Sequence, residues 1–158
     1  MAIQIGQQAP DFTLVNIEKQ PVSLSSFKGQ NVVLLFFPLA FSSVCTAELC
    51  SVRDEMARYN NLETKVIGIS IDSLFTLAKY KEDQQYNFEL LSDFNKEVSA
   101  AYGALYSEFF GMKGVSKRAA FVIDREGVVR YAEVLEDAGQ QPNFTLILKT
   151  LEELPLTV

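Results

Sequence analysis

Pro38, Ser42 and Cys45 bring a proline, a hydroxyl and a thiol together within one short segment. Ser42 follows the proline by four residues, and Cys45 follows Ser42 by three. Residues 46–54 behind the thiol have the composition of a helix, so we expect Cys45 in a first helical turn. Unpaired backbone N–H groups and the positive end of the helix dipole stabilise a thiolate there. A buried cysteine is more often inert packing, but the thiolate is the nucleophilic form, and this coincidence of residue types favours a reactive sulfur.

The chain contains no histidine, which excludes Cys–His and Ser–His–Asp catalysis. Two cysteines and scattered carboxylates are a poor ligand set for zinc, so no metal is expected. A thiolate at Cys45 must then be stabilised by backbone dipoles and a cation. Arginine is the natural candidate, because its guanidinium stays protonated at any relevant pH.

Length and composition predict one globular domain. The chain has 158 residues, 48% of them hydrophobic, and a net charge of −6, which argues against a nucleic-acid partner. No segment looks like a signal peptide or a membrane span, and two cysteines are too few for a secreted disulfide framework. We expect a cytoplasmic protein without a membrane partner, with one domain over residues 1–158 and a loose tail at 155–158.

Strands and helices alternate along the chain, and Cys45 follows the most apolar strand. Residues 32–37 are continuously apolar, as in a strand buried on both faces. The helix predicted over 43–60 carries an apolar stripe at Cys45, Leu49, Val52, Met56 and Tyr59. The remaining expectations are an N-terminal hairpin (9–14 and 21–24), strands at 65–70 and 88–91, helices at 73–81 and 95–102, a loop at 102–115, a hairpin (118–123 and 128–131) and a closing helix after Pro142.

This order predicts an α/β fold with a central mixed sheet flanked by helices. It is similar to a thioredoxin-like core with an N-terminal β-hairpin. Three separated motifs resemble the peroxiredoxins. Pro38, Ser42 and Cys45 meet the pattern Pro-x-x-x-(Thr/Ser)-x-x-Cys, Arg118 precedes an apolar strand that ends in Asp, and residues 6–14 are similar to the N-terminus of that family. The stretch 36–41 looks most like the AhpE-type branch.

The resemblance implies a thiol peroxidase that reduces hydrogen peroxide and organic hydroperoxides without a cofactor. Cys45 would become a sulfenic acid, and Arg118 would stabilise the thiolate and bind the peroxide. Ser42 and backbone N–H groups would hold a peroxide oxygen, and Pro38 would limit water access. Glu48 matches a family position that orients the arginine. The resemblance also suggests a homodimer, although the related branches include monomers as well. The aromatic pair at 109–110 either packs in the core or, if exposed, is a candidate dimer surface.

Cys50 is a feature shared with the bacterioferritin-comigratory-protein branch. Five residues along a helix place it about 140° around and roughly 7.5 Å up from Cys45, beyond the usual disulfide window of about 4.4–6.8 Å between Cα atoms. A Cys45–Cys50 disulfide would therefore require the first turns of the helix to unwind. Either Cys50 resolves the sulfenic acid and a thioredoxin-like protein restores the thiols, or an external thiol or glutaredoxin-like protein attacks Cys45 directly.

Two other functions remain open at this point. A thiol–disulfide oxidoreductase would share the fold, but it normally has two cysteines separated by two residues, whereas four residues separate Cys45 and Cys50. A non-catalytic thioredoxin-like binding module would need no activated thiol.

Overall fold

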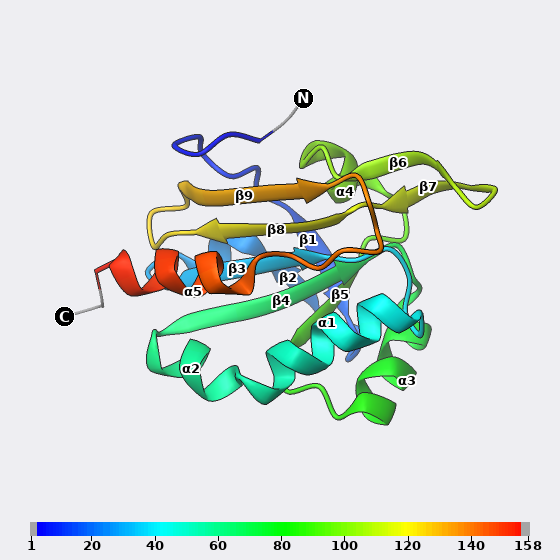
Figure 1. The fold of residues 1–158 in the computed structure, drawn as a ribbon, viewed down its shortest axis with the longest axis horizontal. Coiled ribbons are helices and arrows are strands. Elements are labelled where there is room, and N and C mark those ends of the chain that lie inside the picture. The colour runs from blue at the N-terminus through cyan, green and yellow to red at the C-terminus, as the bar shows by residue number, and fades with distance from the viewer. Residues whose placement is uncertain (1–2, 156–158) are drawn as a thin grey trace.

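A seven-stranded mixed sheet forms the centre of the computed structural model, which describes residues 3–155 (Figure 1). Its strand order is β2-β1-β5-β4-β3-β8-β9. β3, β4 and β5 are parallel, whereas β8 and β9 continue the sheet in antiparallel sense. This arrangement confirms the predicted mixed α/β sheet. Most of the tail predicted at 155–158 lies outside the described residues.

The elements follow the predicted order with two differences: the first long helix is divided into α1 and α2, and a hairpin precedes β8. They are β1 (Thr13–Asn16), β2 (Pro21–Ser23), the 3-10 turn η1 (Leu24–Phe27), β3 (Asn31–Phe36), α1 (Ser43–Asp54), α2 (Met56–Asn61), β4 (Thr64–Ser70), α3 (Leu74–Gln84), β5 (Glu89–Ser92), α4 (Glu97–Ala101), β6 (Leu105–Phe109), β7 (Met112–Ser116), β8 (Arg118–Ile123), β9 (Val129–Leu135) and α5 (Phe144–Glu153).

Both faces of the sheet are covered, which explains why every residue of β3 is buried. One face packs against α1, α2, α3 and α5, the helices in the foreground of Figure 1. The other face packs against the N-terminal segment, η1 and α4. Successive side chains of a strand point to opposite faces, so Val33 and Leu35 enter the first core while Val32 and Leu34 enter the second.

The apolar stripe predicted for the first long helix is confirmed. Cys45, Leu49, Val52, Met56 and Tyr59 are all buried in the same core. The single helix expected over 43–60 is instead two helices, because the backbone turns at residue 55 between α1 and α2. The stripe continues across this break, so both helices stay packed on the sheet.

The N-terminal hairpin is also confirmed, with β1 paired antiparallel to β2. Its turn is closed by the buried side chain of Asn16, whose Oδ1 accepts the backbone N–H groups of Glu18 and Gln20. β1 begins later than expected, and β2 forms the edge of the sheet.

The loop expected over 102–115 was wrong, because this segment contains the hairpin of β6 and β7. Phe109 pairs with Met112, so Phe110 and Gly111 form a two-residue turn in which both φ angles are positive, 50° and 80°. Such turns match the twist of a hairpin but usually carry Asn-Gly or Asp-Gly. The sequence Phe-Gly therefore lacked the usual turn signal.

Within residues 3–155, no helix has the length and hydropathy that a bilayer crossing requires.

Candidate active site

Cys45 lies in the first turn of α1, as predicted. β3 ends at Phe36, and residues 38–42 lead directly into the helix, which has Ser42 at its N-cap position. The first hydrogen bond of the helix runs from the Thr46 N–H to the Ser42 carbonyl. The N–H groups of residues 43–45 therefore precede the helical ladder and lie at the positive end of its dipole. Cys45 itself is completely buried.

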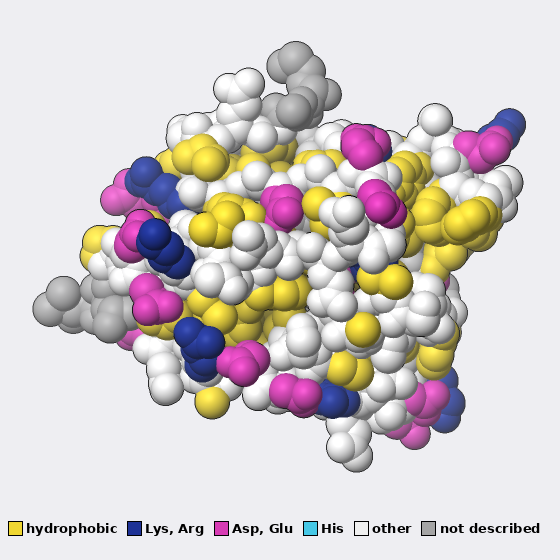
Figure 2. Space-filling model, in the orientation of Figure 1, with side chains coloured by type: hydrophobic (Ala, Val, Ile, Leu, Met, Phe, Trp, Pro, Cys, Tyr) yellow, Lys and Arg dark blue, Asp and Glu magenta, His cyan; other side chains and the backbone are white. Residues whose placement is uncertain are grey.

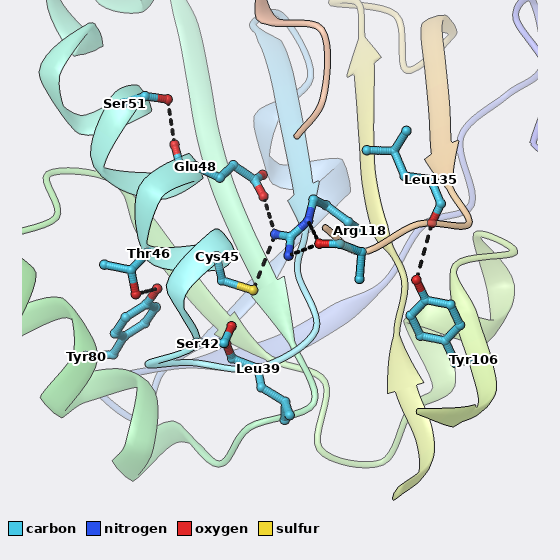
Figure 3. A network of polar contacts seen from close by, with 11 residues as sticks. Leu39, Ser42, Cys45, Thr46, Glu48, Ser51, Tyr80, Tyr106, Arg118 and Leu135 are labelled. Carbon is cyan, nitrogen blue, oxygen red and sulfur yellow. Dashed lines mark hydrogen bonds and ion pairs between the residues drawn. The ribbon is translucent and has the colours of Figure 1, made fainter. Parts of the chain in front are cut away.

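Arg118 contacts both Cys45 and Glu48, although about 70 residues of sequence separate them from it (Figure 3). Its Nη1 donates to Cys45 Sγ at 3.3 Å and to Glu48 Oε1 at 2.7 Å. The guanidinium is only 2% exposed, and Glu48 is fully buried. One buried cation thus faces two acidic side chains, which are one helical turn apart on α1.

The other edge of the guanidinium is held by the backbone. Arg118 Nε and Nη2 both donate to the carbonyl oxygen of Ala138, at 3.1 and 2.9 Å. Ala138 lies in the loop between β9 and α5, and sequence reasoning did not identify it. A backbone acceptor has no residue-type signal, so only the tertiary structure reveals this contact. Together these bonds fix the plane of the guanidinium beside the sulfur.

Burial governs the electrostatics of this group. It raises the pKa of Glu48 to about 7, because desolvation and the nearby Glu133 outweigh the lowering effect of Arg118. Burial also acts against the charge of Arg118, yet Cys45 and Glu48 together raise the pKa of Arg118 above its usual value. Glu48 Oε2 is buried and finds no hydrogen-bond partner within residues 3–155. An unpaired buried carboxylate oxygen is costly, which fits a carboxyl group that binds a proton near neutral pH.

Pro38 and Ser42 lie on the loop before α1, and both line the cavity that Arg118 also lines. Pro38 is buried, whereas Ser42 is exposed. Ser42 does not cap the helix with its side chain; its hydroxyl donates to the carbonyl of Leu39 at 2.8 Å. The hydroxyl proton is therefore engaged in the loop, and the lone pairs of the oxygen remain available to accept a hydrogen bond.

A cavity of about 640 Å³ adjoins this group of residues. Pro38, Ser42 and Arg118 form one side of it, and the hairpin of β6 and β7 contributes Tyr106 and Phe109 to the opposite side. Figure 2 shows hydrophobic side chains gathered on this hairpin at the right of the molecule. The space next to the guanidinium is thus walled largely by apolar and aromatic groups.

Cys50 faces a different part of the structure. Its Sγ contacts Gln84 Oε1 at 3.5 Å and the Tyr86 hydroxyl at 3.9 Å. Gln84 is the last residue of α3, and Tyr86 lies two residues after it. Both cysteines are free thiols. The two sulfurs therefore lie on different sides of α1, as the rotation of a regular helix predicts.

Comparison with known proteins places this geometry in a family. Residues 5–132 match the AhpC/TSA family. The chain belongs to that family. It is 38% identical over 135 residues to alkyl hydroperoxide reductase E of Mycobacterium tuberculosis, covering 84% of this chain and 86% of that protein. It is 36% identical over 145 residues to a chloroplastic 2-cysteine peroxiredoxin of Chattonella marina, covering 85% and 72%.

Solved structures agree with the sequence relatives. The crystal structure of peroxidoxin BcpB from Mycobacterium tuberculosis superposes with a TM-score of 0.86 at 29% identity, over 97% of this chain and 99% of that chain. The protein is therefore a peroxiredoxin with a thioredoxin-like fold, and it is a thiol-dependent peroxidase. Its substrate is a peroxide and its reductant is a thiol. Membership of this family decides between the peroxidase and the two alternative functions.

We expect Glu48→Gln to remove a pH-dependent loss of stability. The folded state holds the Glu48 proton up to about pH 7, whereas an ordinary glutamate releases it near 4.5. The folded state then binds more protons in this window, so the free energy of unfolding falls as pH rises and levels off above pH 7. The wild type should lose on the order of 3 kcal/mol more than the variant between these pH values.

Urea unfolding of both proteins at half-unit steps from pH 4 to 8 measures this difference. Comparison with the variant cancels the titration of the other carboxylates. Parallel stability curves for the two proteins would show that Glu48 ionises normally in the folded state.

Proposed function

We propose that Cys45 is the sulfur that reduces the peroxide, with Arg118 as the cation that stabilises its thiolate. The contact of 3.3 Å between Arg118 Nη1 and Cys45 Sγ carries this proposal. It supplies a permanent positive charge in a chain without histidine. The N–H groups at the start of α1 add to the same field.

The chemical step transfers one oxygen atom to sulfur. The Cys45 thiolate attacks the terminal oxygen of ROOH, an S–O bond forms and the O–O bond breaks. The products are a sulfenic acid on Cys45 and an alkoxide, which takes up a proton to become ROH, or water when R is hydrogen. Arg118 and the backbone N–H groups of residues 44 and 45 stabilise the departing oxygen as it gains negative charge.

The neighbouring residues hold the substrate and the cation. The Ser42 oxygen accepts a hydrogen bond from the peroxide, since its own proton is given to Leu39. Pro38, buried beside the cavity and without an N–H, keeps water away from the thiolate. Glu48 acts through Arg118, to which it is bonded at 2.7 Å, and so keeps the guanidinium beside the sulfur.

Organic hydroperoxides as well as hydrogen peroxide fit the cavity. Its volume of about 640 Å³ exceeds what hydrogen peroxide needs. Tyr106 and Phe109 offer aromatic surface against which an alkyl or aryl group can pack while the peroxide group faces Arg118.

Cys50 completes the cycle in this proposal. Cys50 attacks the sulfenic acid at Cys45, a disulfide forms and water leaves. A thioredoxin-like protein then reduces the disulfide. The alternative is direct attack on Cys45 by an external thiol or a glutaredoxin-like protein, with Cys50 as a passive, half-buried thiol. We favour the disulfide because Cys50 lies on the same short helix and is free.

Association and location complete the proposed function. Phe110 is 90% exposed and Met112 39% exposed at the tip of the β6–β7 hairpin, next to the cavity. Exposed apolar groups of this kind mark interfaces, so we assign the hairpin to a homodimer contact. A cycle that ends with thiol reduction needs a reducing compartment, and this supports a cytoplasmic location.

Arg118→Lys is expected to slow peroxide reduction by roughly 10²-fold. Lysine keeps the charge but lacks the planar fork that contacts Cys45, Glu48 and Ala138 together. Stopped-flow measurement of sulfenic acid formation gives the rate, and Cys45→Ser should abolish it. The matched control is Arg130→Lys, a substitution in an exposed ion pair with Asp124, which should leave the rate unchanged. An undiminished rate in Arg118→Lys would refute the role of the guanidinium.

Cys50→Ser should lose turnover with thioredoxin and keep it with dithiothreitol. The variant still forms the sulfenic acid, which a small thiol can reach, but it cannot form the disulfide that a dithiol protein reduces. Mass spectrometry of the wild type after one equivalent of peroxide should show a disulfide between residues 45 and 50. A persistent sulfenic acid in the wild type would favour the external thiol.

Phe110→Ser should weaken the homodimer, raising its dissociation constant by roughly tenfold or more, because it removes the most exposed aromatic group of the hairpin. Sedimentation velocity over a concentration series measures the change. The control is Phe75→Ser on α3, a residue that is also exposed, at 68%, and lies outside the hairpin. A wild-type protein that sediments as a monomer at all concentrations would contradict the assignment.

A further inference from the structure

The two cysteines can meet only if the start of α1 leaves its present position. Cys45 points toward Arg118 on β8 (Figure 3). The sulfur of Cys50 instead contacts Gln84 and Tyr86. α1 is regular from Ser43 to Asp54, so both sulfurs keep these directions while the helix is intact. Whatever holds the first turn of α1 in place therefore controls access of Cys50 to the sulfenic acid.

Tyr80 on α3 makes such a contact. Its hydroxyl shares a hydrogen bond of 3.0 Å with Thr46 Oγ1, and Thr46 directly follows Cys45 (Figure 3). Tyr80 is completely buried, with its ring 6.1 Å from that of Phe37 and 5.0 Å from that of Tyr86. Burial raises the pKa of Tyr80, so the phenol keeps its proton. A rigidly packed hydroxyl thus bonds to the turn that has to move.

The same ring holds the loop that leads into α1. Phe41 lies with its ring centroid 4.9 Å from that of Tyr80 while remaining 49% exposed. Its φ angle is 69°, in the left-handed region that costs energy for a bulky residue. Next to it, the Ala40 N–H donates to Asp72 Oδ2 at 2.8 Å. The loop is therefore strained at Phe41 and kept in place by contacts with Tyr80 and Asp72.

Oxidation of Cys45 weakens its contact with Arg118 and leaves the contacts of Thr46 and Phe41 with Tyr80 intact. Arg118 attracts a thiolate, but a sulfenic acid is neutral, so the attraction falls once Cys45 is oxidised. The contacts of Thr46 and Phe41 with Tyr80 do not depend on the charge of the sulfur. After oxidation they carry a larger share of the energy that keeps the first turn of α1 folded.

We propose that Tyr80 is a positioning residue that sets how fast the first turn of α1 detaches after Cys45 has been oxidised. This inference rests on the proposed role of Cys50. Detachment lets the Cys50 thiol attack, which gives the disulfide and water. While the turn stays in place, a second ROOH converts the sulfenic acid into a sulfinic acid and ROH. Tyr80 therefore influences what fraction of the sulfenic acid becomes the disulfide and what fraction is oxidised further to the sulfinic acid.

Tyr80→Phe tests this proposal, because it keeps the ring and removes the hydroxyl. Thr46→Val removes the other partner, and Thr46→Ser, which keeps a hydroxyl, is the matched control. Loss of one hydrogen bond should speed disulfide formation by about fivefold in the first two variants. Rapid quench, alkylation and mass spectrometry follow the disulfide after one equivalent of hydrogen peroxide. The preceding formation of sulfenic acid should keep its wild-type rate in all three variants.

The same variants should resist overoxidation. The peroxide concentration that converts half of Cys45 to sulfinic acid should rise by a similar factor in Tyr80→Phe and Thr46→Val, and stay unchanged in Thr46→Ser. An unchanged rate of disulfide formation in Tyr80→Phe, in a protein whose wild type does form the disulfide, would overturn the proposal. So would equal changes in both chemical steps, since these would indicate general loosening of the site.

Failure of the Cys50 proposal gives a different result. A wild-type protein that forms no Cys45–Cys50 disulfide would refute resolution by Cys50 and, with it, control of that step by Tyr80. Hydrogen exchange in the Cys50→Ser background then decides whether Tyr80 holds the helix. Amides of residues 46–50 should exchange about fivefold faster with Tyr80→Phe. Unchanged exchange would show that Tyr80 does not hold the turn.

Discussion

The proposed active site is built around one buried guanidinium, that of Arg118, which faces the Cys45 thiol and the Glu48 carboxyl group. Arg118 lies within hydrogen-bonding distance of the Cys45 sulfur and the Glu48 carboxyl group, and the Ala138 carbonyl occupies its remaining edge. A buried cation is costly unless its donors are satisfied, so these three partners hold one another in place. The two acids also compete for the same positive charge. Burial raises the pKa of Glu48 to about 7, so near neutral pH this carboxyl group carries less negative charge than an ordinary glutamate, while it still accepts a hydrogen bond from Arg118 at 2.7 Å.

The sheet explains how residues so distant in sequence meet. β8 runs antiparallel to β3, with Ala119 opposite Phe36, so Arg118 at the start of β8 lies beside the end of β3. The chain leaves β3 at that end and enters α1 within a few residues. Cys45 at the start of α1 therefore lies within contact distance of Arg118. The pairing thus brings a permanently charged guanidinium to the sulfur in a chain without histidine, which is the contact that our proposal rests on.

Two faces of α1 contact different parts of the protein. One face presents Cys45 and Glu48 to Arg118, and the other presents Thr46 and Cys50 to α3 and the residues after it. In the proposed cycle, reduction of the peroxide needs the first face intact, because the helix N-terminus and the guanidinium act on the sulfur together. Formation of a Cys45–Cys50 disulfide needs the same face to detach from Arg118. On this proposal, the contacts between α1 and α3 influence the balance between the two steps.

The sequence alone was sufficient for the parts that depend on local chemistry. The spacing of Pro38, Ser42 and Cys45 placed a thiol at a helix start, and the apolar run at 32–37 placed a buried strand before it. The missing histidine called for a cation, and the resemblance to the peroxiredoxins indicated Arg118. Periodicity also placed the buried stripe of α1 and α2, because a helix repeats its face every 3.6 residues.

Contacts between distant backbone groups and packed rings were decided by the tertiary structure. The acceptor at Ala138 and the bond between Thr46 and Tyr80 follow from how loops and helices dock, and no residue type marks them. The β6–β7 hairpin escaped prediction because Phe110 takes a positive φ angle that side chains disfavour and that pairing of the strands imposes. Local preference determines which segments form helices and strands, whereas long-range packing determines which groups come into contact.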